Sequence, residues 1–288
     1  MFTELGCDSV REELQKNIIN DVKNYKSKGI CPKLAVFRIG EDPGQVSYAN
    51  SIIKQSEFCG IETQIISFPE NVSQAIVEVA LRVVNDDDLV HGILMLRPFP
   101  KQIDEEKIKR ILNPAKDVDA ITDASIAKTF MANQDVFYKC VAVACVEVLN
   151  YYKVGIAGKK VTIIGRSTTV GKPISLMMLN ENASVNICHS KTAVEDQIEA
   201  CKNADIVILS TGQTEKYGSE YFRDGQIILD VGTGEGKDGK IHGDLNVSEI
   251  ESSGEINDLR YTPVPGGIGM ITTVALLRNV IKGVRNVI

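Results

Sequence analysis

The chain has 288 residues, which suggests one large or two ordinary domains and a core large enough to need no disulfide or structural metal. A formal net charge of -6 argues against non-specific nucleic-acid binding and favours a soluble metabolic protein. The seven cysteines are odd in number and contain no C-x-x-C pair, which fits reduced thiols better than a disulfide framework or a zinc site. Because we find neither a secretory signal nor an apolar run of the ~20 residues that span a membrane, we expect a cytoplasmic protein with no metal, no nucleic-acid partner and no membrane partner.

The first half of the chain alternates helices and strands. Its helical segments carry apolar residues at helical spacing and are expected over residues 8–25, 48–58, 73–85 and 105–112. Its strands are expected over residues 34–39, 63–68 and 92–96. Such an alternation predicts a mostly parallel sheet.

A second alternation follows residues 141–152, a helix that is apolar on nearly every side, as expected between two domains. We place the domain boundary inside it, near residue 145. Further strands are expected over residues 161–165, 184–188, 205–210 and 226–231, with helices over residues 172–181 and 193–202. Residues 237–240 are expected to form a hairpin turn, and an apolar helix over residues 271–284 is expected to return to the first domain.

The segment from Val161 to Pro173 has the order of a dinucleotide-binding strand–turn–helix unit. Gly165 allows a sharp turn, Gly171 allows the helix and strand to pack closely, and the first helical N–H groups can face a pyrophosphate. The spacing G-x-S-x-x-x-G differs from G-x-G-x-x-G, so an ordinary strand–turn–helix remains open. Gly212 ends a later strand, where a doubly wound sheet opens its ligand crevice.

The residues after the second strand of this unit favour NADP over NAD. An NAD enzyme usually carries an acid there for the ribose 2′-hydroxyl, whereas this chain has Ser190 and Lys191. Arg166 in the preceding turn adds a second cation. Because a hydroxyl and cations suit a 2′-phosphate, the sequence predicts NADP as the cofactor.

Four motifs extend over the whole chain. They are Gly40-x-Asp-Pro43 with Tyr48, Lys116-Asp-Val-Asp119, the glycine turn that begins at Gly165, and Pro263-Val-Pro-Gly-Gly-Ile-Gly269. With these motifs the chain resembles the methylenetetrahydrofolate dehydrogenase/cyclohydrolase family from end to end.

The resemblance implies two α/β domains with a deep cleft between them, the second a Rossmann-type doubly wound parallel sheet. Residues 1–145, completed by the C-terminal helix over residues 271–288, are expected to hold a tetrahydrofolate derivative. Residues 146–270 are expected to hold NADP, and the cleft to bring the folate methylene carbon to the nicotinamide. Members of the family are typically homodimers that pair through the nucleotide-binding domain, which implies a homodimer here.

The resemblance also implies roles for single residues. Asp119 matches the aspartate that hydrogen-bonds the pterin ring and Tyr48 the tyrosine that lies along it, so both are expected to be catalytic. Without the resemblance, a loop cap and a core tyrosine would be the ordinary interpretations. The expected substrate-binding set is Tyr48, Ile52, Asp119, Pro265, Gly266 and Gly267. The expected cofactor-binding set is Gly165, Arg166, Ser167, Gly171, Ser190, Gly212 and Thr233, although the family usually has isoleucine at the position of Thr233.

The departures from the family lie in or near the folate side. The family helix reads Tyr-x-x-x-Lys, and here the fourth residue after Tyr48 is Ile52. The family strand ends Gln-Leu-Pro-Leu-Pro, and here Leu96 and Arg97 stand at its first two positions. Lys139-Cys-Val-Ala142 stands where the family has Pro-Cys-Thr-Pro. Because a lysine–glutamine pair supports the family's cyclohydrolase step, these changes favour the dehydrogenase over the cyclohydrolase.

Three functions therefore remain. The first is NADP-dependent oxidation of 5,10-methylenetetrahydrofolate in one-carbon metabolism, with a weak or absent cyclohydrolase step. The second is a fully bifunctional enzyme in which another group, such as Lys54, replaces the lysine. The third is a divergent, non-catalytic dinucleotide-binding paralogue with a changed ligand, for which Arg97 could recruit an acid. An unrelated NADP reductase such as a shikimate-type dehydrogenase is the next enzyme class, and the motif from Pro263 to Gly269 argues against it.

Overall fold

A computed structural model describes residues 2–132, 136–236 and 238–287 of the chain. The chain divides into two compact units, one formed by residues 1–11 and 141–272 and the other by residues 12–140 and 273–288. Both units are α/β, as the sequence predicts. We call the first the nucleotide unit, because it contains the Gly165 turn, and the second the Asp119 unit.

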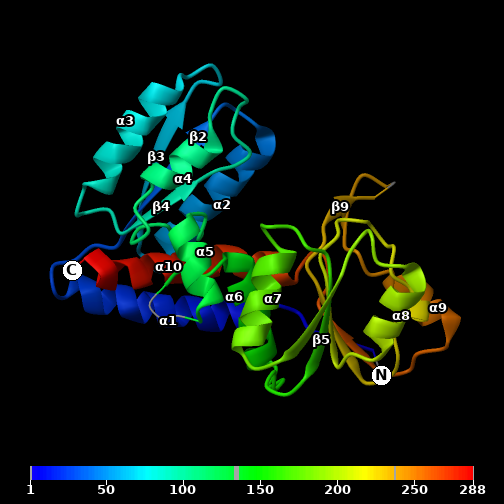
Figure 1. Cartoon of the computed structure of the whole chain (residues 1–288). Helices are drawn as coiled ribbons and strands as arrows, with labels where there is room; N and C mark the ends of the chain where they lie inside the picture. Colours follow the sequence, from blue (N-terminus) through cyan, green and yellow to red (C-terminus); the bar gives the residue numbers. More distant parts are fainter. Residues whose placement is uncertain (1, 133–135, 237, 288) are drawn as a thin grey trace. The chain divides into compact units, whose positions relative to one another are not determined.

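The Asp119 unit contains a three-stranded parallel sheet in the order β3-β2-β4. Its strands are β2 (Lys33–Ile39), β3 (Glu62–Phe68) and β4 (Gly92–Met95). The crossovers through α2 (Pro43–Cys59) and α3 (Gln74–Asn85) step in opposite directions along the sheet. Right-handed crossovers therefore place α2 and α3 on opposite faces, as Figure 1 shows. Five of the seven residues of β2 are buried, and the strand forms the middle of the core, where Ala35 and Phe37 pack with residues of α3 and β4.

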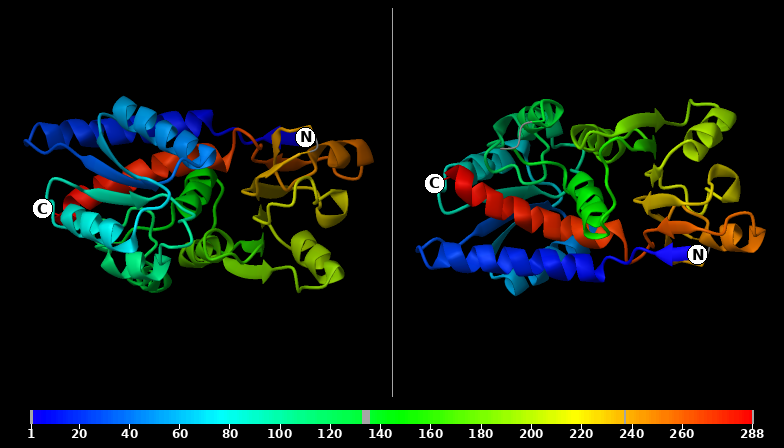
Figure 2. Two further views of the ribbon diagram at one scale, coloured as in Figure 1. Left: turned by 90° about the horizontal axis from the view of Figure 1, so that it is seen from above. Right: turned by 90° about the horizontal axis from the view of Figure 1, so that it is seen from below.

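Helices from distant parts of the sequence complete this unit. They are α4 (Glu105–Ile111), α5 (Asp123–Phe130), and parts of α1 (Asp8–Lys26) and α10 (Ile268–Val287). Both views of Figure 2 show α1 and α10 side by side, and Arg285 Nε donates to the Tyr25 hydroxyl at 3.3 Å. Residues 273–288 of the C-terminal helix thus group with residues 12–140, while the expected completion of the first domain by residues 271–288 stays a prediction.

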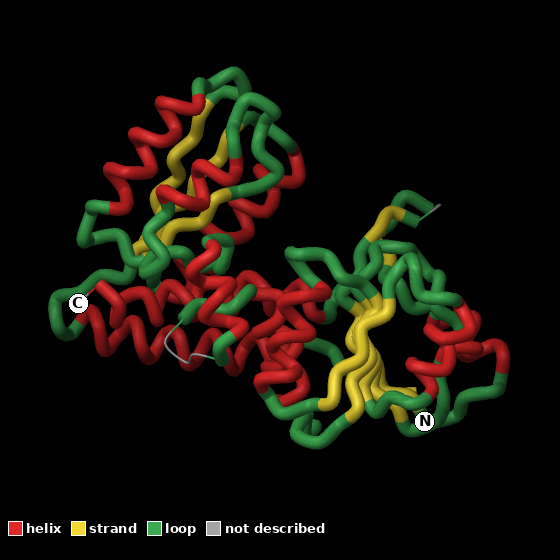
Figure 3. Tube along the Cα trace, viewed as in Figure 1, coloured by secondary structure: helices red, strands yellow, loops and turns green. Residues whose placement is uncertain are grey.

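The nucleotide unit contains a six-stranded parallel sheet in the order β1-β11-β8-β7-β5-β6. Its strands are β1 (Phe2–Glu4), β5 (Lys160–Ile164), β6 (Ser184–Cys188), β7 (Ile206–Leu209), β8 (Gln226–Asp230) and β11 (Leu259–Tyr261). The chain leaves β5 toward β6 and returns past β5 to β7, so α7 (Gly171–Asn180) and α8 (Val194–Lys202) cover opposite faces (Figure 3). This is the Rossmann-type doubly wound sheet that the sequence predicts, and α6 (Cys140–Tyr151) and α9 (Val247–Ser253) complete the unit.

The structure adds short elements that the sequence analysis does not predict. The three-residue strands β1 and β11 pair with each other, which joins the N-terminal residues to the nucleotide unit. Two-residue strands β9 (Gly234–Glu235) and β10 (Ile241–His242) flank the expected turn over residues 237–240, of which residue 237 lies outside the described residues. The expected domain limits, residues 1–145 and 146–270, stay a prediction. Within the described ranges, no helix is long and apolar enough to cross a membrane.

Candidate functional site

A cavity of about 370 Å³ opens in the Asp119 unit between the start of α2 and the end of β4. Its lining residues are Asp42, Gly44, Gln45, Tyr48, Leu94, Met95, Leu96, Arg97 and Asp119. Helix α2 begins here because Pro43 occupies its first turn and the Asp42 carboxylate accepts the Gln45 N–H at 2.9 Å. This cap, which the sequence analysis did not predict, starts the helix earlier than residue 48 and orients its first turn on the cavity.

The Asp119 loop is held by a second carboxylate of the same motif. Asp117 is fully buried and accepts hydrogen bonds from the backbone of Ile121 and Thr122 and from the hydroxyls of Thr122 and Ser125, at 2.8–2.9 Å. Helix α10 supports the loop from the other side, because Asn279 Nδ2 donates to the Val118 carbonyl at 2.8 Å. With Asp117 committed to these bonds, Asp119 is the carboxylate of this motif that lines the cavity.

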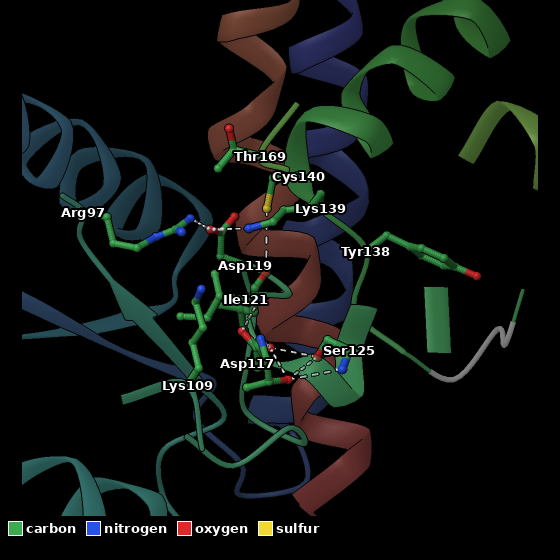
Figure 4. A network of polar contacts seen from close by, with 12 residues as sticks. Arg97, Lys109, Asp117, Asp119, Ile121, Ser125, Tyr138, Lys139, Cys140 and Thr169 are labelled. Carbon is green, nitrogen blue, oxygen red and sulfur yellow. Dashed lines mark hydrogen bonds and ion pairs between the residues drawn. The ribbon is translucent and has the colours of Figure 1, made fainter. Parts of the chain in front are cut away.

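Two cations bind the Asp119 carboxylate. Arg97 Nη2 lies 3.3 Å and Lys139 Nζ 3.2 Å from the same oxygen, Oδ2, and Figure 4 shows the two side chains approaching from opposite sides. Arg97 also binds Glu105 at 3.1 Å, and Lys109 binds Glu105 at 3.0 Å. Burial raises the pKa of Glu105, but the hydrogen bonds and charges of Lys109 and Arg97 outweigh it and hold that pKa below its ordinary value. Opposite charges thus alternate from Asp119 and Arg97, which line the cavity, to Glu105 and Lys109, which do not.

Two uncharged polar groups also line the cavity. Tyr48 is 38 % exposed, yet burial of its hydroxyl raises the pKa well above its ordinary value, with the charges of Cys140 and Asp119 adding to the shift and a hydrogen bond to Thr273 opposing it. Tyr48 is therefore a neutral hydrogen-bonding group at physiological pH. Gln45 Nε2 donates to the Pro98 carbonyl at 2.9 Å, while Gln45 Oε1 is buried without a hydrogen-bond partner among the described residues.

Apolar side chains occupy the two positions where the resemblance implies a lysine and a glutamine. Ile52 lies one turn after Tyr48 on α2 but is fully buried and is not among the residues that line the cavity, so its expected contact with substrate stays a prediction. Leu96 lines the cavity and is 4 % exposed. Lys54 is exposed to solvent and is also absent from the lining residues.

In the nucleotide unit, the Gly165 turn is too tight for side chains. Gly165 has φ +125°, and a Cβ there would lie 2.5 Å from the Ser210 carbonyl oxygen. A Cβ on Gly171 would lie 2.2 Å from the Gly165 carbonyl oxygen. Ser167 Oγ accepts the Val170 N–H at 3.1 Å and the Gly171 N–H at 3.4 Å. The glycines thus have the close-packing role that the sequence predicts, and Ser167 orders the start of α7.

Arg166 and Ser190 follow the ends of two neighbouring strands. Ile164 pairs with Cys188 in the parallel register of β5 and β6, and each of the two polar residues stands two positions later. Because paired strands lie about 4.8 Å apart, this register brings the two loops together at one edge of the sheet. Arg166 and Ser190 are both exposed, so their polar groups remain accessible to a ligand.

A buried pair of aspartates fixes the ends of β7 and β8. Asp244 Oδ2 accepts the backbone N–H of Thr211 and Gly212, and Asp230 Oδ1 accepts the N–H of Gly232 and Asp244. Burial raises the pKa of Asp230 to about 7; the nearby charge of Asp244 adds to this shift, and the backbone hydrogen bonds oppose it. The pair therefore positions the Gly212 loop, where the sequence predicts a cofactor contact.

The remaining predicted site residues lie on loops of the nucleotide unit. Thr233 and Pro265 are exposed, and Gly266 has φ +103°, which favours glycine. A Cβ on Gly267 would lie 2.2 Å from the Pro263 carbonyl oxygen, so this turn also requires a glycine. Within the described ranges, no group of three or more His, Cys, Asp or Glu side chains could hold a metal ion.

Comparison with known proteins decides the family. Residues 5–119 match the catalytic domain of tetrahydrofolate dehydrogenase/cyclohydrolase, and residues 139–287 match its NAD(P)-binding domain. The chain belongs to the tetrahydrofolate dehydrogenase/cyclohydrolase family. It is 37 % identical to the bifunctional protein FolD of Clostridium kluyveri over 277 residues, which are 96 % of this chain and 95 % of that protein. The unrelated reductase class that the sequence analysis left open is thereby excluded.

Solved structures of the family have the same fold. The bifunctional FolD enzyme of Campylobacter jejuni is 31 % identical, with a TM-score of 0.93 and 99 % coverage of both chains. The FolD enzyme of Trypanosoma brucei, solved with NADP and an inhibitor, is 26 % identical, with a TM-score of 0.89 and coverage of 99 % of this chain and 97 % of that one.

Two features of the cavity do not follow from the family motifs in the sequence. The first is Gln45, because nothing in the sequence shows that the Asp42 cap turns it toward the cavity. The second is the shared contact of Arg97 and Lys139 with Asp119, which the departures from the family motifs do not by themselves predict. The sequence does carry a signal for this contact, since both cations stand where the family motifs have uncharged residues and a carboxylate is expected nearby.

Proposed function

We propose that the protein oxidises 5,10-methylenetetrahydrofolate to 5,10-methenyltetrahydrofolate with NADP, and that its hydrolysis of the methenyl product to 10-formyltetrahydrofolate is weak or absent. The observation that carries this proposal is the contrast between the polar side chains that line the cavity and the apolar ones at the family's hydrolytic positions. Asp119 and Tyr48 are available to bind a pterin ring, while Ile52 and Leu96 stand where the family places the lysine and glutamine of the hydrolytic step. Apolar side chains can enclose a ring but cannot move a proton.

NADP fits the residues of the nucleotide unit. The glycine turn at Gly165 allows a pyrophosphate to approach the first turn of α7, and Arg166 with Ser190 can hold a 2′-phosphate. When bound, the nicotinamide supplies the hydride acceptor. The chain's own groups then have one task in the oxidation, which is to bind and orient the two rings. That task needs no general base, so it survives the loss of the lysine.

A second candidate is a fully bifunctional enzyme, and two side chains favour it. Lys139 lies 3.2 Å from Asp119 and Gln45 lines the cavity, so a lysine and a glutamine are present at other positions. Against this candidate, the Lys139 ammonium is bound to the Asp119 carboxylate, and Lys139 is not among the residues that line the cavity.

A paired assay on the purified protein separates the candidates. The first arm follows methenyltetrahydrofolate formation from methylenetetrahydrofolate with NADP, and the second follows the decay of added methenyltetrahydrofolate against its spontaneous rate. We expect oxidation in the first arm and decay at the background rate in the second. Rapid enzymatic decay that Lys139→Met abolishes would favour the bifunctional enzyme. Absence of oxidation, with NADP still bound, would favour a non-catalytic paralogue.

We further propose that the protein is a homodimer, on the family resemblance alone. Its mass in solution, measured by light scattering at several concentrations, tests this.

A further inference from the structure

Arg97 is a cation on the cavity wall where the family strand has leucine. Its Nη1 contacts Glu105 at 3.1 Å and its Nη2 contacts Asp119 Oδ2 at 3.3 Å. A guanidinium carries five N–H donors, so these two contacts leave others for a ligand. Lys139 binds the same carboxylate oxygen but is not among the residues that line the cavity. Of the two cations, Arg97 is therefore the one that faces a ligand.

The other oxygen of Asp119 is open. Within the described residues, Asp119 Oδ1 has no hydrogen-bond partner, and the Asp119 side chain is 25 % exposed. The two cations fix the carboxylate through Oδ2 and leave Oδ1 to accept from a ligand. Asp119 and Arg97 thus present an acceptor and a donor next to each other (Figure 4).

Gln45, which also lines the cavity, has a side-chain oxygen that is free to accept a hydrogen bond. The Pro98 carbonyl can only accept a hydrogen bond, so it fixes Nε2 as the atom of Gln45 that faces it. The remaining amide oxygen is then the buried atom without a partner among the described residues. Buried polar groups are nearly always hydrogen-bonded, so a ligand that brings N–H or O–H donors would satisfy it.

A 2-amino-4-oxo pyrimidine edge matches this arrangement. Along the edge lie a ring nitrogen acceptor, the amino donor, the ring N–H donor and the oxo acceptor. At either end, a donor therefore stands beside an acceptor. A ring whose N–H binds Asp119 Oδ1 brings the neighbouring acceptor toward the guanidinium of Arg97, where a charge-assisted hydrogen bond can form.

We propose that Arg97 is a specificity-determining residue that donates directly to an acceptor atom of the substrate's pterin-type ring edge, beside the N–H bound by Asp119. This inference rests on the proposed function, because it takes a tetrahydropterin as the occupant of the cavity. It assigns to Arg97 a contact that a leucine cannot make. Lys139 has the separate role of holding the carboxylate.

The test measures tetrahydrofolate binding to the full-length protein by isothermal titration calorimetry. The variants are Arg97→Leu, Arg97→Lys and Lys139→Met, with Arg110→Leu, an exposed arginine of α4, as the matched control. The Arg97→Leu change is repeated in an Asp119→Ala background. NADP affinity is measured for every variant as a check of folding, because its predicted site lies in the other unit.

We expect Arg97→Leu to weaken tetrahydrofolate binding about tenfold or more, the size of one charge-assisted hydrogen bond. Arg97→Lys should recover part of the loss, Lys139→Met should cost about threefold, and Arg110→Leu should bind as wild type. In the Asp119→Ala background, Arg97→Leu should still weaken binding about tenfold.

Two results would overturn the inference and leave the proposed function standing. One is an Arg97→Leu loss equal to that of Lys139→Met, which would show that both cations only hold the carboxylate. The other is no effect of Arg97→Leu once Asp119 is absent. If instead the wild type neither binds tetrahydrofolate nor oxidises methylenetetrahydrofolate, the proposed function itself fails. Should Asp119→Ala not fold, the comparison of the two single cation variants decides the question.

Discussion

Asp117 and Asp119 are two carboxylates of one motif with different surroundings. Asp117 is fully buried, and its oxygens accept hydrogen bonds from the loop that it closes. Asp119 is 25 % exposed at the side chain, contacts two cations and lines the cavity. The sequence gives both residues the same chemistry, and only burial and hydrogen-bonding partners separate a structural carboxylate from a binding one.

The exchange of Asp119 for asparagine tests the binding role. We expect Asp119→Asn to keep the fold and NADP affinity but to lose most methylenetetrahydrofolate oxidation, because the amide presents a donor where the ring also presents donors. Steady-state rates and NADP titrations measure the two properties separately. Oxidation near the wild-type rate would remove Asp119 from the site and favour a changed ligand.

Arg166 carries the expected preference for NADP. Each charge-assisted hydrogen bond contributes roughly 1.5–3 kcal/mol, so Arg166→Ala should weaken NADP binding by about one to two decades while NAD binding barely changes. Fluorescence titration with both cofactors gives the comparison, and the exposed Arg110→Ala serves as the control. Equal weakening of both cofactors would mean that Arg166 has a general structural role at the turn.

At the scale of elements, the sequence predicts long segments well and short ones poorly. The buried strands β2, β5 and β8 and the helices around them follow from apolar runs and glycine turns, because these patterns are local. The three-residue strands β1 and β11 are stabilised by pairing across more than 250 positions of the chain, which no local pattern reports. For the same reason, no local pattern reports that Arg97 and Lys139 both contact Asp119, because the fold brings these three residues together.

Helix α10 shows how an element contributes to the site from a distance. Asn279 is buried and donates to the carbonyls of Val118, at 2.8 Å, and Tyr138, at 3.2 Å. Asn279→Ala leaves both carbonyls without this donor, so we expect a loss of about 1–3 kcal/mol in the free energy of unfolding. Because Val118 precedes Asp119, the Michaelis constant for methylenetetrahydrofolate should also rise, while that for NADP should not.

Urea unfolding and initial rates of Asn279→Ala measure both effects, and Asn50→Ala on the exposed face of α2 is the matched control. A variant that loses stability but keeps its Michaelis constants would show that the loop holds its position without α10.

At the scale of the whole molecule, each unit is stabilised by its own core. A buried titratable group makes the free energy of unfolding depend on pH. Among the described residues, Asp230 is a carboxyl whose pKa is raised to about 7, from an ordinary value of 3.8, by burial first and the charge of Asp244 second. The Asp230 carboxylate accepts the N–H of Gly232 and of Asp244, and Asp244 in turn accepts the N–H of Gly212. Its titration is therefore expected to affect the Gly212 loop, where a cofactor contact is predicted, as well as the free energy of unfolding.

The sign of the effect follows from linkage. The folded protein holds the Asp230 proton more tightly than the unfolded chain does, so this group's contribution is fully present below about pH 4 and is lost as the pH rises to about 7. In Asp230→Asn the titrating group is absent, and this part of the pH dependence disappears. The stability of wild type relative to Asp230→Asn should therefore fall by about 2–3 kcal/mol between pH 5 and pH 8.

Urea unfolding of both proteins at a series of pH values measures that difference, with Asp88→Asn, an exposed aspartate, as the control. The asparagine also loses one acceptor, because Asp230 Oδ2 accepts the Leu245 N–H at 2.9 Å, so a constant offset between the curves is expected in addition to the slope. Only the change of the difference with pH reports the titration. Parallel curves from pH 5 to pH 8 would mean that Asp230 stays ionised in the folded protein and that the hydrogen bonds to its carboxylate outweigh its burial.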